Sequence, residues 1–331
     1  MDIRTLKYEA DQTLRSAAYP PRRLVLIHTG IALGVSLVLA LISYLLDNGV
    51  SSGGGLSGMG TQAALSTAQV VMQLASAVAM PFWQAGLVCT ALGYVRRQQV
   101  SPWKLAEGFR RFKPILSSGI MMGIQYLGMG FISVYLSSFV VTFTPFTAPV
   151  YELAEMLMEN PDLDITALNL NADGMMAFIV AYLVIFLILY AVLALPLYYR
   201  YRMVNYIIMD QPKVGGLAAL FRSRAMMRGR RMRLFKLDLS FWWFYVLELL
   251  LSVVAMADLL LAAVGVKLPV SDGVAYWGFQ LLAVAGQLGL YYLARPQMEV
   301  TYALCYETFC QTEEPKPQST PKPPKAHPWT Y

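Results

Sequence analysis

Basic residues gather in one stretch of this chain, residues 213–236, which holds eight Lys and Arg residues and no Asp or Glu. The planar guanidinium group of arginine donates two parallel hydrogen bonds to one phosphate, which the ammonium group of lysine does not. The stretch therefore predicts a binding site for phosphate groups. Its candidate ligands are Arg222, Arg224, Arg228, Arg230, Arg231 and Arg233.

Apolar residues are interleaved with these arginines, and they are Leu217, Leu220, Phe221 and Met227. Arginine tolerates such surroundings because its stem lies on an apolar surface while the guanidinium group reaches a phosphate. Nucleic acid would also attract arginines, but the apolar residues and the hydrophobic stretches on either side favour anionic lipid. The alternative is that the charges only fix the topology of the chain in a membrane, which requires no particular geometry.

A second candidate is Glu248, which lies about nine residues into an apolar stretch, or about 14 Å at 1.5 Å per residue. A charged acid at that depth of a bilayer costs at least about 2.5–3.5 kcal/mol, so we expect it to be protonated or hydrogen-bonded. Gln287, at comparable depth in the next apolar stretch, is the candidate partner. A proton or cation pathway is the other interpretation, but a pathway usually needs more than one such acid.

The other reactive residues form no catalytic or metal-binding pattern. Cys89, Cys305 and Cys310 make no CxxC, and His28 and His327 are the only histidines. No HExxH, P-loop, nucleophile elbow or kinase set is present. The sequence thus indicates no catalytic residue, metal or cofactor, and it favours a non-enzymatic role.

Composition places these residues in a membrane protein. Hydrophobic residues are 57% of the chain, charged residues are 14%, and the mean hydropathy is +0.49. A soluble domain has about 45–50% apolar and about 25% charged residues. One soluble core cannot bury this excess, so we predict an all-α, polytopic membrane protein with short cytoplasmic amphipathic helices.

Six apolar stretches are long enough to cross a hydrocarbon core about 30 Å thick. They lie at residues 24–46, 63–95, 115–145, 175–199, 239–266 and 274–294. Basic amphipathic segments precede the first of them, in residues 1–23, and follow the second, in residues 96–114. The predicted membrane domain is 24–310, with a further basic segment at 200–238. Residues 311–331, rich in proline and lysine, are predicted to be disordered.

Charge placement gives the orientation. If both termini are cytoplasmic, 25 of the 26 Lys and Arg residues lie on the cytoplasmic side and only Lys267 lies outside. The positive-inside rule therefore predicts cytoplasmic N and C termini. Two Gly-x-x-x-Gly spacings, Gly30 to Gly34 and Gly119 to Gly123, permit close helix contact, either within the chain or with a homo-oligomeric or other membrane-protein partner.

Three stretches carry a resemblance to a known family. They are RRQQVSPWKLAEGFRRFKPIL (96–116), RYRMVNYIIMD followed by SRAMMRGRRMRLFKLDLSF (200–241), and RPQMEVTYALCYETF (295–309). The chain resembles the bacterial integral membrane proteins known as domain of unknown function 975. It departs from them at Arg231, where lysine is usual, and in a longer acidic loop. The resemblance implies a multi-pass protein of the bacterial plasma membrane and supplies no catalytic residues.

Overall fold

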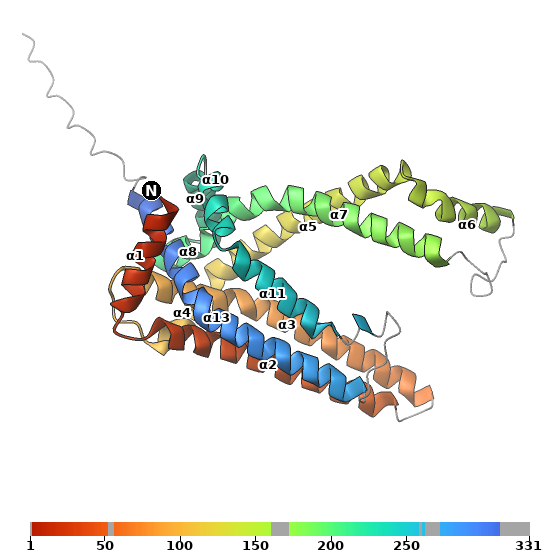
Figure 1. The fold of residues 1–331 in the computed structure, drawn as a ribbon, viewed down its shortest axis with the longest axis horizontal. Helices are drawn as coiled ribbons and strands as arrows, with labels where there is room; N and C mark the ends of the chain where they lie inside the picture. Colours follow the sequence, from red (N-terminus) through yellow and green to blue (C-terminus); the bar gives the residue numbers. More distant parts are fainter. Residues whose placement is uncertain (1, 52–55, 160–171, 258–259, 262–271, 312–331) are drawn as a thin grey trace, which may run out of the picture. The chain divides into compact units, whose positions relative to one another are not determined.

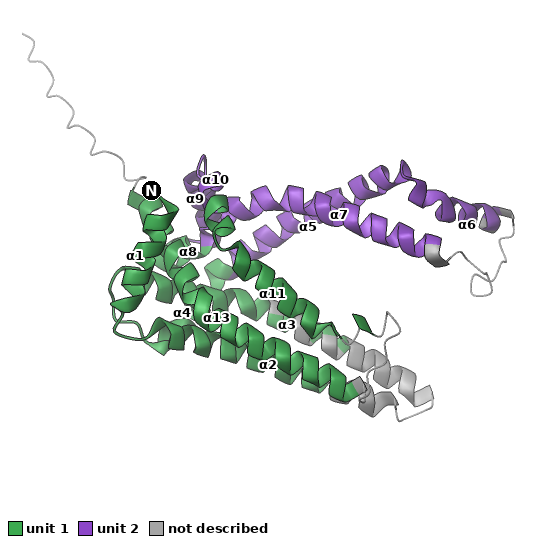
Figure 2. Cartoon of the chain, viewed as in Figure 1, with its two compact units in different colours: residues 1–115, 205–214, 235–331 green, residues 116–204, 215–234 purple. Residues whose placement is uncertain are grey.

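The computed structural model of this protein describes residues 2–51, 56–159, 172–257, 260–261 and 272–311. Every element in these ranges is a helix, as the sequence predicts (Figure 1). The chain divides into two compact units (Figure 2). Unit 1 comprises Met1–Ile115, Asn205–Val214 and Phe235–Tyr331, and unit 2 comprises Leu116–Val204 and Gly215–Leu234.

Unit 1 is built around the long helix α13, Asp272–Gln311. It packs against four other helices (Figure 1), namely α1 (Ile3–Arg15), α2 (Pro21–Ser51), α3 (Leu56–Val95) and α11 (Trp242–Ala255). The N-terminal helix α1 is amphipathic, and it buries Leu6 and Ala10. Ala10 joins Leu24, Leu87 and Val300 in one apolar core, so helices distant in the sequence share a single interior.

Two short elements, η1 (Pro102–Ala106) and α4 (Glu107–Arg110), pack directly on the backbone of α3. A Cβ atom at Gly86 would lie 1.8 Å from the carbonyl oxygen of Leu105, and one at Gly108 would lie 1.9 Å from that of Phe82. Only glycine allows this approach.

The spacing of Leu105, Phe109 and Phe112 predicts one shared helical face, and all three lie against α3. The backbone of Leu105 lies against Gly86, and the rings of Phe109 and Phe112 lie 5.8 Å and 4.9 Å from the ring of Phe82. Leu105 is buried, whereas the two phenylalanines are about half exposed. The segment is not one helix, because it starts as a 3-10 turn and breaks at Arg111, where φ is −103° and ψ is 39°.

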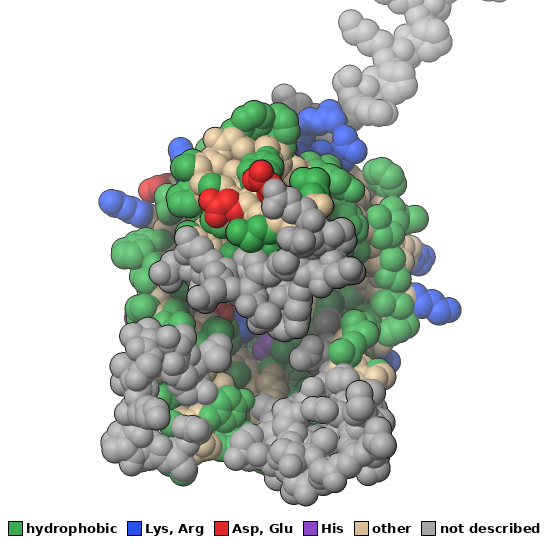
Figure 3. Space-filling view, turned by 90° about the vertical axis from the view of Figure 1, so that its right-hand side faces the viewer, with side chains coloured by type: hydrophobic (Ala, Val, Ile, Leu, Met, Phe, Trp, Pro, Cys, Tyr) green, Lys and Arg blue, Asp and Glu red, His purple; other side chains and the backbone are tan. Residues whose placement is uncertain are grey.

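Unit 2 contains two long apolar helices, α5 (Phe112–Thr142) and α7 (Ala172–Tyr201), and between them lie η2 (Pro145–Thr147) and α6 (Ala148–Glu159). Large apolar side chains are exposed along both long helices, for example Phe131 at 65% and Val192 at 64%. Hydrophobic side chains also cover much of the described surface in the space-filling view (Figure 3). Exposed apolar surface on this scale is compatible with a membrane environment.

Four described helical stretches are long and apolar enough to cross a membrane: Pro21–Leu39, Leu74–Val95, Phe112–Thr142 and Gly174–Asp210. A fifth is possible if α10 (Arg231–Leu239) and α11, which are bent by 61°, count as one. The predicted number of six is not confirmed. The predicted fifth stretch is described as helix α11 only to Ala255, and residues 262–271 lie outside the described part.

The predicted sixth stretch lies inside α13, which is not among the helices that meet these limits of length and composition. Gln280 and Gln287 lower its apolar character. The C-terminal tail, 312–331, and the acidic residues beyond Glu159 up to position 171 lie outside the described residues.

Candidate functional site

The arginine-rich segment, residues 213–236, folds into α9 (Gly216–Met226) and the first part of α10. Gly229, in the turn between them, has a φ of 76°, a left-handed conformation that favours glycine. Helix α9 buries Ala219 and Ser223. The Ser223 Oγ donates a hydrogen bond of 2.9 Å to the carbonyl oxygen of Arg200, so the segment is anchored at the end of α7.

The outward face of α9 carries apolar and basic side chains together. Leu217 is 49% exposed and Phe221 is 68% exposed. Arg224, also exposed, follows Phe221 by three residues, a spacing that places the two side chains on one face. Leu220 and Met227, expected from the sequence to offer apolar contact to lipid, are instead buried, because the register of the segment turns them inward.

The six predicted phosphate ligands differ in exposure. The exposed ones are Arg222, Arg224, Arg228 and Arg233. The other two, Arg230 and Arg231, are partly buried. Arg222 and Arg230 take part in interactions within the chain. The Nε of Arg231 is buried and has no hydrogen-bond partner among the described residues. The segment therefore presents several guanidinium groups outward.

The site prediction missed Arg200 and Arg202, which lie beside the anchoring point of α9. The guanidinium carbon of Arg202 lies 5.0 Å from the ring centroid of Tyr198, and that of Arg200 lies 6.0 Å from that of Tyr201. The Nε of Arg200 is buried without a hydrogen-bond partner in the described structure. Tyr and Arg alternate at the end of an apolar stretch, a pattern that is typical of membrane interfaces. This pattern could have identified Arg200 and Arg202 from the sequence.

Glu248 lies on α11 in unit 1, and its carboxylate accepts a hydrogen bond from the hydroxyl of Tyr291 on α13. Gln287, the expected partner, lies one turn before Tyr291 on the same helix. The structure thus gives Glu248 a different partner, since the long tyrosine side chain reaches it from the next turn. The guanidinium carbon of Arg295 lies 4.8 Å from the ring centroid of Tyr291.

Two further acids of unit 1 are also held by tyrosines of α13. Asp238 of α10 accepts a hydrogen bond of 2.5 Å from Tyr302, and Asp210 of α8 (Val204–Asp210) accepts one of 3.0 Å from Tyr306. We call these two pairs and the pair of Glu248 with Tyr291 the tyrosine–acid ladder. The ladder joins α13 to α8, α10 and α11.

Arg96, directly after α3, strengthens the Asp210 end of the ladder. Its guanidinium group lies 2.6 Å from Asp210 Oδ1 and 2.6 Å from Glu307 Oε1. Burial lowers the pKa of Arg96, but the two carboxylates outweigh burial and raise the pKa. Burial, with hydrogen bonds to Cys310 and Asp210, also raises the pKa of Tyr306, so its hydroxyl remains a donor. These charges are paired inside the fold.

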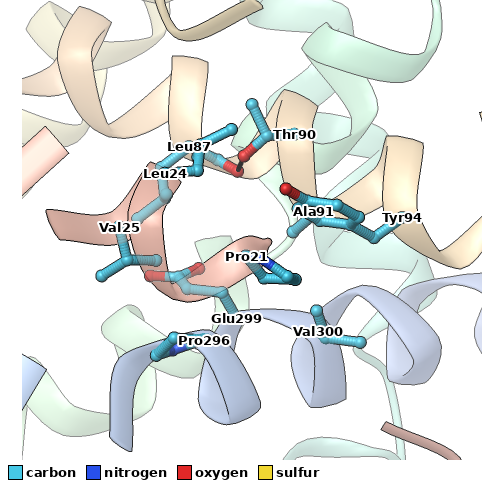
Figure 4. A pocket seen from close by; sticks show the side chains of 10 residues that line it. All are labelled: Pro21, Leu24, Val25, Leu87, Thr90, Ala91, Tyr94, Pro296, Glu299 and Val300. Carbon is cyan, nitrogen blue, oxygen red and sulfur yellow. Dashed lines mark hydrogen bonds between the residues drawn. The ribbon is translucent and has the colours of Figure 1, made fainter. Parts of the chain in front are cut away.

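Arg295 is likewise surrounded by polar partners. Its Nη2 donates a hydrogen bond of 2.8 Å to Gln84 Oε1, and its Nε lies 3.5 Å from Glu299 Oε1. Glu299 also lines a cavity of about 10 Å³ between α2, α3 and α13 (Figure 4). That volume is about one water molecule, so the cavity is too small for a substrate.

Unit 1 therefore offers paired charges, and the arginine-rich segment offers outward donors. In the part of the chain that the structure describes, no three His, Cys, Asp or Glu side chains are grouped so that they could hold a metal ion. The arrangement that remains for a ligand is a basic and apolar surface, which suits an anion with apolar surroundings.

The fold and these surfaces define an all-helical protein whose long apolar helices are compatible with a membrane. The chain belongs to the family described as Protein of unknown function (DUF975), whose model matches residues 1–313. This match confirms the resemblance seen in the three sequence stretches. No curated protein and no solved structure matches the chain.

Proposed function

We propose that this protein is a six-span, non-enzymatic membrane protein that binds the phosphate groups of anionic lipids through its arginine-rich segment. One observation supports this most directly: the outward face of α9 presents Arg224 next to the exposed side chains of Leu217 and Phe221. A helix with this mixture lies at a lipid surface, where apolar side chains enter the headgroup boundary and basic ones contact phosphate. The partner is an anionic lipid and not nucleic acid.

The charge of the segment is sufficient for such binding. Each basic residue near an anionic leaflet is worth about 1 kcal/mol. The eight Lys and Arg residues of the segment therefore give ample gross attraction before the costs of ordering and mutual repulsion are subtracted. The guanidinium geometry adds specificity because a planar fork holds two phosphate oxygens at once.

The proposed topology places both termini in the cytoplasm of a bacterial cell and the protein in its plasma membrane. It rests on the placement of 25 of the 26 basic residues on one side. In a cysteine-free background, single cysteines replacing Ser57 and Asp164 are expected to react with a membrane-impermeant maleimide in intact cells. A cysteine replacing Lys213 is expected to stay unlabelled, and its labelling would overturn the topology.

Lipid recognition is tested by changing arginine geometry at constant charge. The variant carries lysine in place of Arg224, Arg228, Arg231 and Arg233. We expect less anionic lipid to co-purify with it, and a smaller rise of its melting temperature on addition of phosphatidylglycerol. The matched control exchanges four exposed arginines outside the segment for lysine, namely Arg4, Arg15, Arg97 and Arg110. If the first variant behaves as the control does, the charges serve topology alone.

A transporter or channel subunit is the second candidate, with Glu248 in the pathway. It is favoured by the polar groups near this acid, because Tyr291 contacts Glu248 and Arg295 lies over the Tyr291 ring. For this function, Glu248→Gln is expected to abolish proton or cation flux in liposomes while expression stays normal. If Glu248→Gln has the same flux as the wild-type protein, Glu248 is not in a transport pathway and this candidate is removed. If the wild-type protein has no measurable flux, the lipid-binding function remains.

A further inference from the structure

Exposure changes abruptly along the long helices of unit 1. On α3, Val78 and Met80 are exposed, whereas every residue of 82–95 is buried or partly buried. On α13, Leu293 is exposed, whereas every residue of 294–310 is buried or partly buried. Each helix therefore has a part with exposed apolar side chains and a part that other elements cover.

Contacts between side chains place these changes at one level. The rings of His28 on α2 and Trp83 on α3 are stacked, with their centroids 5.0 Å apart. The Nη2 of Arg295 on α13 donates a hydrogen bond of 2.8 Å to Gln84 of α3. The first exposed apolar side chain of α2, Leu26, lies within one turn of His28. One plane through these contacts therefore separates the covered part of all three helices from the part with exposed apolar side chains.

The covered part has an interior like that of a protein in water. Leu24, Leu87 and Val300 of the three helices share one apolar core with Ala10 of α1 and Leu105 of η1. Helices α1 and α4 lie at one end of α2 and α13 (Figure 1). Water drives apolar side chains into such a core, whereas lipid tails give no comparable drive. The covered part therefore suits water, and the part with exposed apolar side chains suits hydrocarbon.

Charge and length divide the helices at the same level. Helix α13 has no charged residue at 273–293, and Arg295, Glu299 and Glu307 follow. From Pro81 to Val95, α3 extends for about 21 Å at 1.5 Å per residue. The headgroup layer on one side of a bilayer is only about 5–8 Å thick. A helix that leaves the hydrocarbon at Pro81 therefore reaches well beyond the headgroups by Val95.

Aromatic and basic side chains are exposed at this level. Phe109 and Phe112, which pack on the ring of Phe82, are each about half exposed. Arg110 and Lys113 follow them in the sequence and are exposed as well. Exposed phenylalanine beside Lys and Arg is the composition with which interfacial segments enter the headgroup boundary.

A second group of this kind lies on α2 and α13. The guanidinium carbon of Arg22 lies 5.8 Å from the ring centroid of Tyr292, and both side chains are exposed. Tyr292 lies one turn before Arg295, hence close to the same level. Leu26 shares a helical face with Arg22, and both Leu26 and Leu293 are exposed. Tyrosine and arginine at the end of an apolar surface are typical of a membrane interface. We give the name interfacial belt to Phe109, Phe112, Arg22 and Tyr292.

We propose that the cytoplasmic surface of the membrane crosses unit 1 at the level of Pro81, where the interfacial belt contacts phospholipid headgroups. Helix α3 then leaves the hydrocarbon at Pro81 and not at Val95. Residues 82–108 and 294–311 form a cytoplasmic domain together with α1. The inference rests on the proposed membrane location of the protein, and it does not depend on lipid binding by the arginine-rich segment.

A membrane surface explains these observations better than a partner protein does. A protein bound to Phe109 and Phe112 would cover one patch and leave the change of exposure along α2 and α13 without a cause. A bilayer surface is a plane, so it meets the three helices and both parts of the interfacial belt at one level. Arg22, Arg110 and Lys113 also suit the phosphates of an anionic leaflet.

The position of the surface is tested by measuring depth with nitroxide spin labels. Single cysteines replace Ala75 and Ala106 in a cysteine-free background, and the labelled chains are reconstituted into vesicles of phosphatidylglycerol and phosphatidylcholine. Both alanines are exposed, and they lie on opposite sides of the proposed surface, since Ala106 follows Leu105, which lies against Gly86. Collisions of the label with oxygen and with a water-soluble nickel chelate report depth, because oxygen concentrates in hydrocarbon.

We expect the ratio of oxygen to nickel collisions to be several-fold higher at Ala75 than at Ala106. A label at Gln98, exposed beyond the end of α3, is the reference for water, and the ratio at Ala106 should be close to it. A surface at Val95 would instead place Ala106 in hydrocarbon, so a ratio as high as that at Ala75 overturns the inference. Neither result depends on orientation, so these measurements and the labelling at Lys213 fail separately.

The interfacial belt is tested with a label that replaces Phe109. We expect its collision ratio to lie between those at Ala75 and Ala106, as for a side chain among headgroups. A label that neither oxygen nor nickel reaches would mean that protein covers this position, and it overturns the headgroup contact. A ratio equal to that at Gln98 overturns it as well, because the side chain would then be in water.

A measurement on the wild-type chain serves if a labelled variant does not fold. A small apolar diazirine that partitions into the hydrocarbon of the vesicles is activated by light, and the modified peptides are identified. We expect modification within residues 74–81 and none within residues 96–106. Equal modification of the two segments overturns the inference.

Discussion

One arginine and one glycine from each unit have opposite surroundings. In unit 1, Arg96 lies between two carboxylates, and Gly86 lies against the backbone of η1. In unit 2, Arg224 is exposed, and Gly123 has no atom within 4 Å of its Cβ position. Arg96 and Gly86 thus hold the fold of unit 1 together, whereas Arg224 and Gly123 remain available at the surface of unit 2.

The largest effect on stability is expected when one methyl group is added to a glycine of unit 1. Gly86→Ala forces α3 and η1 apart, because its Cβ would lie 1.8 Å from the Leu105 carbonyl oxygen. We expect a loss of about 3 kcal/mol or more in the free energy of unfolding. Gly128→Ala in unit 2 is expected to be neutral or stabilising by up to about 1 kcal/mol, since alanine is the better helix former. Equal melting temperatures in detergent would contradict the comparison.

Removal of a paired charge ranks next. Arg96→Met keeps the stem and leaves Asp210 and Glu307 without their cation. Because the Arg96 side chain is 34% exposed, solvent screening reduces the effect, and we expect a loss of about 1–3 kcal/mol. Arg228→Met on the exposed segment is the control, with an expected change within about 0.5 kcal/mol. Chemical denaturation of both purified variants measures their free energies of unfolding. A similar loss in Arg96→Met and Arg228→Met would contradict a stabilising role of the Arg96 ion pairs.

A smaller effect is expected from one rung of the tyrosine–acid ladder. Tyr302→Phe removes the hydroxyl that donates to the buried Asp238, at a cost of about 1–2 kcal/mol. Tyr8→Phe serves as the control, because Tyr8 is 64% exposed. Thermal unfolding of the two variants should show a lower melting temperature only for Tyr302→Phe. A lower value for both would assign the effect to something other than the ladder.

The smallest effect on stability is expected at Glu248. Glutamine retains a carbonyl oxygen that accepts the Tyr291 hydrogen bond, so Glu248→Gln should change the free energy of unfolding by less than about 1 kcal/mol. Glu248→Leu removes the acceptor and should be more destabilising than Glu248→Gln. If the order of the two variants is reversed, the hydrogen bond is not what holds this acid.

The first four apolar stretches were predictable from the sequence because a long apolar helix is recognised by the composition of the helix itself. The stretches at 24–46, 63–95 and 175–199 fall within long helices of the structure, and the stretch at 115–145 extends three residues beyond the end of α5 at Thr142. The fifth and sixth were harder to predict. Helix α11 is bent against α10, and α13 carries glutamines in its apolar part, features that a search for apolar stretches does not register.

Partners distant in the sequence were not predictable. Asp210 and Tyr306 are 96 positions apart, and nothing in the spacing of either indicates the other. Depth in a bilayer pointed to Gln287 as the partner of Glu248, but depth alone does not distinguish residues one turn apart. The two Gly-x-x-x-Gly spacings make no close contact within the chain, because a Cβ at Gly30, Gly34, Gly119 or Gly123 would have no atom within 4 Å, and contact with a membrane partner stays a prediction. The close contact occurs at Gly86 and Gly108, which share no helix.

The tyrosine–acid ladder has a consequence for biosynthesis. Asp210, Asp238 and Glu248 all leave the ribosome before the tyrosines of α13 that hold them. A nascent chain that ends before Tyr291 therefore lacks all three tyrosine donors, although Arg96 is already present to pair with Asp210. Helix α13 supplies these donors and packs against α1, α2, α3 and α11, so unit 1 becomes complete only after the last described helix has been synthesised.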